Sequence, residues 1–287
     1  MAGTLYVVAT PIGNLEDITL RALKVLRGVD LLACEDTRQT AKLLDRYHIC
    51  LPLTSYHEHN EQEKANYLLE QLQAGKQVGL VSDSGTPCLS DPGYRIVRVA
   101  IENGIRVVPI PGASALVAAL SASGRPTNEF VFLGFLPSRK GPRQTFLRKL
   151  KAEPRTLVVY EAPRRLLESL LDIRDILGER RVTIARELTK IHEEFFFGRV
   201  SEAYNHFRAR SVKGEIVLIL ERDELTGNSS GTLDVKEMEL LVKEAMGVHG
   251  ISQKEAIRMV AGQRNVSRRG LYQLLLSNKR TSTGGEL

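Results

Sequence analysis

The sequence has few cysteines and lacks the marks of a secreted or membrane protein. Its three cysteines, Cys34, Cys50 and Cys88, lie far apart and form no Cys-x-x-Cys pair. That spacing argues against a disulfide scaffold and against a zinc site, so we expect reduced thiols. The first residues lack a basic stretch followed by a cleavable apolar segment, and no apolar run is long enough to cross a bilayer. The sequence therefore predicts a cytoplasmic protein.

Three common catalytic or nucleotide-binding motifs are also missing. No Gly-x-Gly-x-x-Gly follows the first predicted strand, and no Gly-x-x-x-x-Gly-Lys-Ser/Thr occurs anywhere. A standard dinucleotide fold and a P-loop NTPase are therefore not supported. No Gly-x-Ser-x-Gly elbow occurs either, which weakens a hydrolase interpretation.

The composition is that of a globular protein with an uneven charge. The chain has 287 residues, 43% of them hydrophobic and 26% charged, so it can bury the core of two domains. The net charge of +6 is concentrated: residues 248–280 hold seven basic side chains and one acidic one, and so do residues 137–155. Such patches favour a polyanionic partner, nucleic acid before membrane. The alternative is a pair of ordinary solvated basic faces.

Proline and glycine follow three predicted strands at the point where each strand ends. Residues 4–10 read as a buried parallel strand, residues 78–81 as an apolar strand and residues 106–110 as a further strand, and each runs into a Pro/Gly loop. These loops cover residues 11–14, 83–87 and 111–115. Ligands of parallel sheets bind beyond the carboxyl ends of the strands, so the loops predict a small-molecule site. Ordinary strand-to-helix turns are the alternative.

Two helix starts and one histidine pair belong to the same region. We expect a helix over residues 91–103 with Asp91 as its N-cap, and a helix N-terminus at Ser114 that offers backbone N–H groups to a ligand. His57 and His59 would share a strand face, but they lack the spacing of a three-ligand site. We therefore predict no metal site.

The sequence after residue 121 predicts a second α/β domain and a helical module. Turn residues cluster over residues 121–129, and strands and helices with a mixed sheet follow. A Gly/Ser linker precedes helices capped by Ser252 and Ser267, a helix-turn-helix pattern with Arg268 and Arg269 in the first turn of the last helix; three-helix packing is the alternative. The predicted domains cover residues 1–121, 122–226 and 233–280.

Ten segments in one order resemble a known family. They are Thr10-Pro-Ile-Gly-Asn14-Leu15, Glu35-Asp-Thr-Arg38, His57-Glu-His-Asn60-Glu61, Val81-Ser-Asp-Ser-Gly-Thr-Pro87, Asp91-Pro-Gly93, Pro111-Gly112, Gly134-Phe-Leu-Pro137, Tyr160-Glu161, Arg186-Glu-Leu-Thr-Lys190 and Lys213-Gly-Glu215. The chain thus resembles the ribosomal RNA small-subunit methyltransferase I family, of the tetrapyrrole (precorrin) methylase fold class. Ser84 departs from the alanine more usual there.

The resemblance implies a fold, a cofactor and a substrate. It implies two α/β domains with S-adenosylmethionine (SAM) in the cleft between them, a C-terminal helix-turn-helix extension and a homodimer. The implied activity is 2′-O-methylation of a cytidine in the decoding region of 16S rRNA, as naked rRNA or in the 30S subunit.

The resemblance also assigns roles to residues. Its cofactor loops correspond to Pro11, Gly13, Asp83, Gly85, Thr86, Pro87, Pro111, Gly112, Ala113, Ser114, Ala115, Tyr160 and Glu161. For the hydroxyl proton we name Glu187 and Lys190; the alternative is a salt-bridge cluster of these two with Arg186. The phosphate-contact candidates are Arg38, Arg139, Lys140, Arg143, Arg268 and Arg269, and splayed bases would suit stacking on Tyr56 or Phe135.

Two other functions remain open at this point. One is methylation of a small tetrapyrrole-like molecule, which the basic patches disfavour. The other is a non-enzymatic SAM sensor that binds nucleic acid through its helix-turn-helix.

Overall fold

The computed structural model describes residues 2–221, 235–263, 268, 270–272 and 275. Contacts divide the chain into two compact units, Met1–Arg222 and Asp223–Leu287. Each unit is described by itself below. Among the described residues, no helix combines the length and apolar character that a bilayer span requires.

The first unit begins with a fully parallel sheet in the order β3-β2-β4-β1-β5. Its strands are β1 (Thr4–Val8), β2 (Leu31–Cys34), β3 (Leu53–Ser55), β4 (Val78–Leu80) and β5 (Arg106–Ile110). Strands β4, β1 and β5 are neighbours, so the three Pro/Gly loops that follow them meet at one edge of the sheet.

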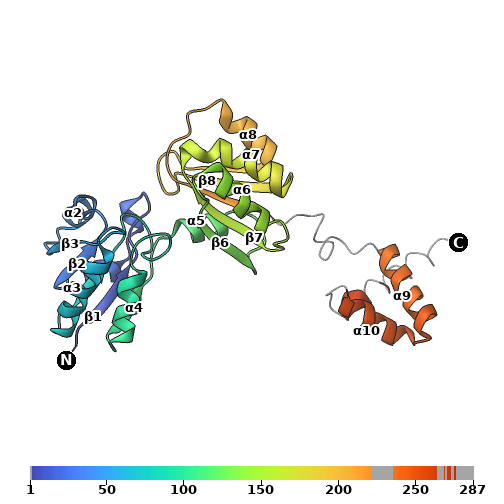
Figure 1. Cartoon of the computed structure of the whole chain (residues 1–287), viewed down its shortest axis with the longest axis horizontal. Helices are drawn as coiled ribbons and strands as arrows, with labels where there is room; N and C mark the ends of the chain where they lie inside the picture. The colour runs from blue at the N-terminus through green and yellow to red at the C-terminus, as the bar shows by residue number, and fades with distance from the viewer. Residues whose placement is uncertain (1, 222–234, 264–267, 269, 273–274, 276–287) are drawn as a thin grey trace. The chain divides into compact units, whose positions relative to one another are not determined.

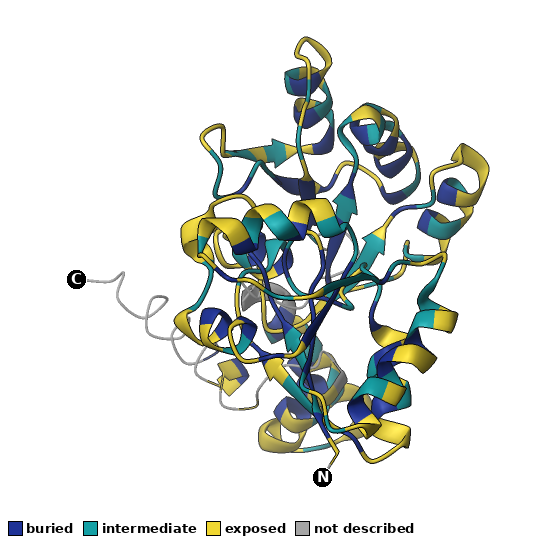
Figure 2. Ribbon diagram, turned by 90° about the vertical axis from the view of Figure 1, so that its left-hand side faces the viewer, coloured by how far each residue is buried: buried dark blue, intermediate teal, exposed yellow. Residues whose placement is uncertain are grey.

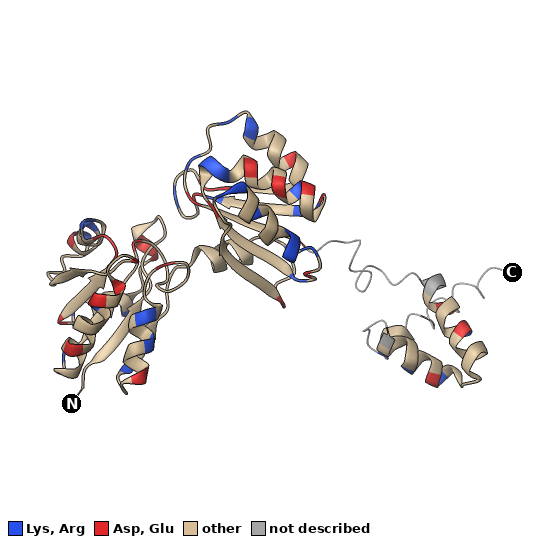
Figure 3. Cartoon of the chain, viewed as in Figure 1, with Lys and Arg blue, Asp and Glu red and all other residues tan. Residues whose placement is uncertain are grey.

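Helices cover both faces of this first sheet (Figure 1). They are α1 (Leu20–Leu26), α2 (Thr37–Arg46), α3 (Glu61–Gln73) and α4 (Tyr94–Glu102), with a 3-10 turn η1 (Leu15–Asp17) before α1. Leu31 packs in the cluster with α3 and α4, whereas Leu32 packs in the cluster with α1 and α2. Acidic residues of α3 lie beside basic residues of α4 (Figure 3), and Arg95 pairs with Glu61 across the two helices at 3.3 Å.

A second, mixed sheet has the order β6-β7-β10-β8-β9, in which only the β6–β7 pair is parallel. Its strands are β6 (Phe130–Phe135), β7 (Thr156–Glu161), β8 (Arg181–Arg186), β9 (Glu194–Arg199) and β10 (Ile216–Leu220), and its helices are α6 (Lys140–Lys149), η2 (Pro163–Arg165), α7 (Leu166–Leu177) and α8 (Val200–Arg208). One face packs under α6, α7 and α8, which expose their outer sides (Figure 2). The three central strands, β7, β10 and β8, are mostly buried, whereas the edge strands β6 and β9 are partly exposed. The predicted mixed sheet is confirmed.

Helix α5 (Ala115–Ser121) covers the opposite face of the second sheet. Its residues Leu116 and Leu120 pack with Val158 and Val217, and with Ile12 from the loop after β1. The predicted boundary at residue 121 lies directly after this helix, which follows β5 in the chain but packs on the second sheet.

Two local predictions in the first sheet are wrong. Helix α4 begins at Tyr94 with Gly93 as its N-cap, so Asp91 is not the cap of this helix. Gly93 has φ 142°, and Cys88 and Ser90 before it also adopt left-handed backbone, which interrupts a helix. Strand β3 ends at Ser55, so His57 and His59 lie in a turn and share no strand face. No cluster suited to a metal ion occurs among the residues searched, which are the described ones.

The second unit contains α9 (Val235–His249) and α10 (Gln253–Gln263). A small core joins them, and Leu271 and Leu275 contribute to it. Ser252 and Glu255 form a reciprocal cap, in which Ser252 N donates to the Glu255 carboxylate at 3.0 Å and Glu255 N to the Ser252 hydroxyl at 3.4 Å. The predicted cap at Ser267 and the side chain of Arg269 lie outside the described residues.

Candidate functional site

A cavity of about 380 Å³ lies at the edge where the strand-end loops of the first unit meet. Residues from the first sheet, the second sheet and α5 line it together. The lining residues are Ile12, Glu35, Asp83, Ser84, Gly85, Thr86, Leu89, Ser90, Asp91, Ser114, Ala115, Phe135, Tyr160, Glu161, Ala162, Pro163, Gly214, Glu215, Ile216 and Val217. We call this space the cofactor cavity.

Seven of the predicted cofactor residues line this cavity. They are Asp83, Gly85, Thr86, Ser114, Ala115, Tyr160 and Glu161. The other six predicted residues, Pro11, Gly13, Pro87, Pro111, Gly112 and Ala113, belong to the same loops but do not line it. The structure therefore brings the three Pro/Gly loops together, as the strand-end argument predicted.

Backbone hydrogen bonds join the loops to one another. Thr10 and Gly85 exchange two, Thr10 N to Gly85 O at 2.8 Å and Gly85 N to Thr10 O at 3.1 Å. The Thr86 hydroxyl donates to the Ala113 carbonyl at 3.2 Å. A Cβ added to Gly112 would stand 3.0 Å from the Ala9 side chain, so glycine permits the close approach there. The loops thus form one fixed wall of the cavity.

The cavity wall is acidic. Glu35, Asp83, Asp91, Glu161 and Glu215 line it, and none of the described lining residues is a lysine or an arginine. Sequence reasoning missed Glu35 and Glu215 as site residues, although both belong to motifs quoted above. Glu35 follows the end of β2, and Glu215 precedes the start of β10. An acidic wall favours a cationic ligand.

Burial changes the acidity of two of these groups. It raises the pKa of the Asp91 carboxyl to about 6, and the neighbouring Glu35, Asp83 and Glu215 act in the same direction. Burial and the charge of Asp83 also raise the pKa of Glu35. The Asp83 carboxylate itself accepts the backbone N–H of Asp36 at 2.8 Å.

Two aromatic residues from the second sheet complete the wall. Tyr160 accepts the Leu116 N–H at 3.2 Å through its hydroxyl oxygen, which ties β7 to the start of α5. Phe135 stands edge-on to Tyr160 with 5.6 Å between ring centroids and keeps 53% of its surface exposed. The irregular register near Phe135 and the left-handed Gly134 (φ 62°) direct this side chain toward the cavity.

Glu187 and Lys190 do not line the cofactor cavity. They line a neighbouring groove together with Gly13 and Asn14, and we call it the outer groove. The two side chains pair with each other at 2.8 Å, and the Lys190 ammonium lowers the pKa of Glu187. Arg186 pairs instead with Glu194 at 2.8 Å, so the three residues do not form one cluster.

Only a thin wall separates this pair from the cofactor cavity. Gly214 lines the cavity, and a Cβ added to it would stand 1.8 Å from the Glu187 carboxylate. Likewise, a Cβ on Gly13 would stand 2.5 Å from Lys190 Cγ. Gly214 therefore lets Glu187 approach the cavity from the groove side, while Gly13 leaves room for Lys190 within the groove.

The basic candidates differ sharply in exposure. Arg139 and Lys140 are exposed at the start of α6, and Arg268 is exposed in the second unit. The Arg38 side chain is 86% exposed and pairs with Asp36 at 2.8 Å.

Two of the predicted RNA contacts are removed by burial. Arg143 is 1% exposed and bonded to Asp172 at 2.7 Å, which leaves it no surface for a phosphate. Tyr56 is 1% exposed and its hydroxyl accepts the Ile96 N–H at 3.2 Å, so it cannot stack on a base. The prediction was wrong at these positions because residue type, basic at Arg143 and aromatic at Tyr56, does not register burial.

The comparisons with known proteins place the chain in a class and then in a family. A family model for tetrapyrrole (corrin/porphyrin) methylases matches residues 4–204, so the chain is a methyltransferase of that class. Relatives named ribosomal RNA small subunit methyltransferase I include one from Halalkalibacterium halodurans, 46% identical over 95% of this chain and 94% of that one, and one from Mesorhizobium japonicum, 48% identical over 98% and 94%. The chain belongs to the ribosomal RNA small subunit methyltransferase I family. A further relative from Thermotoga maritima is 50% identical and is matched over its whole length by 77% of this chain.

Solved structures share the fold at low identity. A cobalt precorrin-4 methyltransferase of cobalamin biosynthesis matches with a TM-score of 0.58 and 16% identity over 76% of this chain and 94% of that one. A uroporphyrin-III C-methyltransferase from Thermus thermophilus, in complex with S-adenosyl homocysteine, matches with a TM-score of 0.53 and 22% identity over 76% and 97%. The predicted fold class is confirmed.

Family membership also confirms SAM as the cofactor, and the cavity suits it chemically. SAM carries a sulfonium and an ammonium, which the acidic wall would attract, and an adenine, which the apolar Ile12, Leu89 and Val217 would accommodate. The residues present therefore fit the cofactor that the sequence predicted.

Proposed function

We propose that this protein transfers the methyl group of SAM to the 2′-oxygen of a cytidine in the decoding region of 16S rRNA. Full-length similarity to relatives named for small-subunit rRNA methylation carries the proposal. The acidic cavity and the exposed basic residues near it support both halves of the reaction, since one suits a cationic donor and the other a polyanionic acceptor. A homodimer in the cytoplasm is part of the same proposal.

Bound SAM would supply a methyl group that is already activated as part of a sulfonium. The protein's remaining work is alignment of the acceptor oxygen and removal of its proton. Asp83 and the loops fixed around Gly85 would hold the donor, because their backbone groups are already ordered without it. Rigid loops of this kind avoid an ordering cost when the donor binds.

Glu187 and Lys190 are our candidates for handling the proton of the ribose hydroxyl. The Glu187 carboxylate would take the proton of the hydroxyl. Because its lowered pKa makes it a weak base, the Lys190 ammonium beside it has the larger task of stabilising the forming alkoxide. Both residues line the outer groove, and Glu187 lies behind Gly214, which lines the cofactor cavity. An acceptor ribose would then enter from the groove.

A substrate panel tests the function. The purified chain receives SAM with a labelled methyl group and one of three acceptors: small subunits that lack the modification, naked 16S rRNA, or a uroporphyrinogen. We expect label in one or both RNA samples and none in the tetrapyrrole. Label in the tetrapyrrole alone would assign the chain to small-molecule methylation, and SAM binding without any turnover would favour the sensor.

The same assay tests the catalytic pair. Lys190→Met should lower kcat about 100-fold, and Glu187→Gln should lower it less. The SAM affinity should stay unchanged in both variants. Arg186→Gln is the matched control, since Arg186 pairs with Glu194 outside the groove. Equal loss in all three variants would mean that the pair only supports the sheet.

A further inference from the structure

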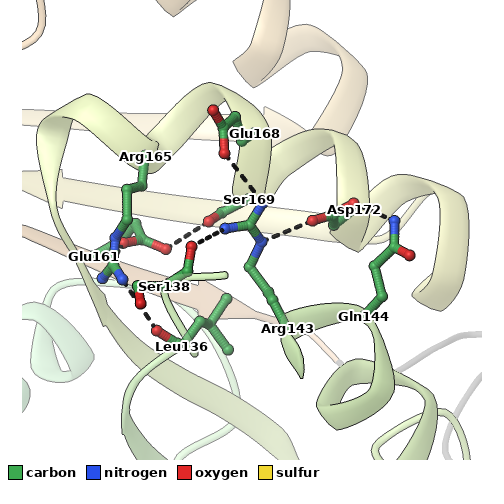
Figure 4. Close-up of polar contacts among 9 residues, drawn as sticks. All are labelled: Leu136, Ser138, Arg143, Gln144, Glu161, Arg165, Glu168, Ser169 and Asp172. Carbon is green, nitrogen blue, oxygen red and sulfur yellow. Dashed lines mark hydrogen bonds and ion pairs between the residues drawn. The ribbon is translucent and has the colours of Figure 1, made fainter. Parts of the chain in front are cut away.

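Two arginines hold the segment that leads from the cofactor cavity to the exposed basic residues. The segment covers residues 135–140; it begins at Phe135 in the cavity wall and ends with Arg139 and Lys140 at the start of α6. We call it the rim segment. Figure 4 shows Arg143 and Arg165 reaching it from either side.

Each arginine donates to a carbonyl of the rim segment. Arg143 Nη1 donates to Ser138 O at 3.2 Å, and Arg165 Nη1 donates to Leu136 O at 3.2 Å. Alternate carbonyls of a short connection are therefore bound by guanidinium groups, whose fixed fork geometry defines direction as well as distance.

Buried carboxylates orient both guanidinium groups. Arg143, at 1% exposure, pairs through Nε with Asp172 at 2.7 Å, and Asp172 is held in turn by Gln144 at 2.8 Å. Arg143 also contacts Glu168 at 3.3 Å. The Asp172 partner lies on α7, so this ion pair joins α7 to α6 and to the rim segment at once.

The second network reaches the cavity wall itself. Arg165 pairs with Glu161 at 2.7 Å, and the fully buried Glu161 accepts hydrogen bonds from the Ser169 hydroxyl at 2.5 Å and from the Ala162 N–H at 2.7 Å. Glu161 and Ala162 also line the cofactor cavity. The rim segment is thereby connected to the same strand end that holds the cavity wall.

Structural stability alone is a poor reason for such networks. Replacing a buried ion pair with apolar residues of similar volume is often neutral or stabilising, because desolvation offsets the attraction. Here the arginines fix the conformation of the rim segment. That segment carries the cavity residue Phe135 at one end and the exposed Arg139 and Lys140 at the other. The cations then face a polyanion with a fixed spacing from the cavity.

We propose that Arg143 and Arg165 are positioning residues for the RNA substrate: they fix the rim segment so that Arg139 and Lys140 contact backbone phosphates while the acceptor lies at the cofactor cavity. This proposal rests on the proposed function, because it takes the polyanion to be RNA. It assigns Arg143, removed above from the direct contacts, an indirect role in the same binding event.

A double-mutant cycle tests the proposal with 16S rRNA as the probe. One arm replaces the ion pair by Arg143→Met with Asp172→Leu, which leaves no buried charge unpaired. The other arm removes the exposed cations by Arg139→Ala with Lys140→Ala. The measurements are the rRNA Kd over a range of salt, the KM for rRNA, kcat, and the SAM Kd.

We expect both arms to raise the rRNA KM about tenfold while the SAM Kd changes little. Losing two phosphate contacts should reduce the slope of log K against log salt by about 1.4. In the combined variant, removal of the cations should have almost no further effect, since they are already misplaced. A purely structural role for the network would leave the salt slope unchanged.

Matched variants keep the test decisive. Arg125→Met with Glu221→Leu removes another partly buried ion pair of the first unit, 2.6 Å long and away from the rim segment, and should leave rRNA binding unchanged. Arg143→Lys keeps a charge beside Asp172 but not the fork, so it should raise the rRNA KM in a folded protein even if the paired replacement does not fold.

Additive effects of the two arms, or an unchanged rRNA KM in Arg143→Lys, would overturn the positioning role. These results are separate from failure of the proposed function. If the unmodified protein neither binds nor methylates rRNA, the function is wrong; if it does both and the cycle is additive, only the positioning role is wrong.

Discussion

The two sheets of the first unit build their sides of the cofactor cavity by different means. On the first sheet, loops are joined backbone to backbone, as in the paired hydrogen bonds of Thr10 and Gly85. On the second sheet, buried charged side chains such as Arg143 and Glu161 fix the wall and the rim segment. Backbone pairing survives most side-chain changes, whereas an ion network fails when one member is lost. The two sides should therefore differ in their response to substitution.

The largest effect is expected from breaking one member of the ion network. Arg143→Met alone leaves Asp172 buried without its partner, so the free energy of unfolding should fall by about 3–5 kcal/mol. Denaturant titration measures this, and the paired Arg143→Met with Asp172→Leu variant should recover most of the loss. A loss well below 1 kcal/mol for the single change would mean that Asp172 finds compensation elsewhere.

On the first sheet, the largest effect should be on binding and not on stability. Asp83→Asn removes a carboxylate charge from the cavity wall, and we expect SAM affinity to fall about 100-fold, equivalent to about 2.7 kcal/mol. Calorimetry measures the affinity and thermal unfolding the stability. Asp17→Asn, at an exposed residue of η1 outside the cavity, is the control. Unchanged affinity in a folded Asp83→Asn protein would show that the cavity is not the SAM site.

Asp91 predicts a pH dependence of SAM binding. Because the pKa of its carboxyl is about 6, Asp91 loses its negative charge as the pH falls from 7.5 to 5. Attraction for the sulfonium weakens in that range, so we expect SAM affinity to fall several-fold in the unmodified protein. Asp91→Asn should bind more weakly at pH 7.5 and show a flatter profile, with the remaining slope due to Glu35. S-adenosylhomocysteine, which lacks the sulfonium charge, is the control ligand.

The free energy of unfolding should respond to pH in the opposite direction to the SAM affinity. The folded Asp91 carboxyl has a pKa above its ordinary value of 3.8, so the folded state binds more protons between about pH 4 and pH 6. Its contribution to the free energy of unfolding is favourable at low pH and is lost as the pH rises through about 6. Denaturant titrations of the unmodified protein and Asp91→Asn should diverge in this way. A parallel pair of curves would contradict the raised pKa.

The smallest effect should come from a helix cap remote from the cavity. The Thr19 hydroxyl accepts the Ala22 N–H at 3.0 Å at the start of α1. Thr19→Ala should reduce the free energy of unfolding by about 1 kcal/mol and leave methyl transfer unchanged. A marked loss of activity would show that the first-sheet wall depends on more than its own backbone pairing.

The same contrast explains what could be predicted from the sequence. The Pro/Gly loops after β1, β4 and β5 were predictable because continuous apolar runs define the strands, and strands of a parallel sheet end at one edge. Five predicted cofactor residues of these loops line one cavity for this reason, whereas Tyr160 and Glu161, at the end of β7, were predicted from the family resemblance. Local sequence patterns were therefore sufficient to predict where these loops lie.

The charged networks could not be predicted in this way. Arg143 meets Asp172, which is 29 residues away, across a helix pair whose packing no local pattern specifies. Arg143 also stands in a run of basic residues that resembles a solvated patch, so its burial was missed. Asp91 was misplaced for a related reason: a capping residue before a proline favours a helix start, but the left-handed Gly93 delays it.

The most direct test of the account is the position of the transferred methyl group. Small subunits that lack the modification are treated with the purified chain and SAM, and the 16S rRNA is then cleaved by mild alkali, which spares a bond next to a 2′-O-methyl group. The account predicts one new protected position, at a cytidine in the decoding region. Label on a base, or at a ribose elsewhere in the rRNA, would contradict it.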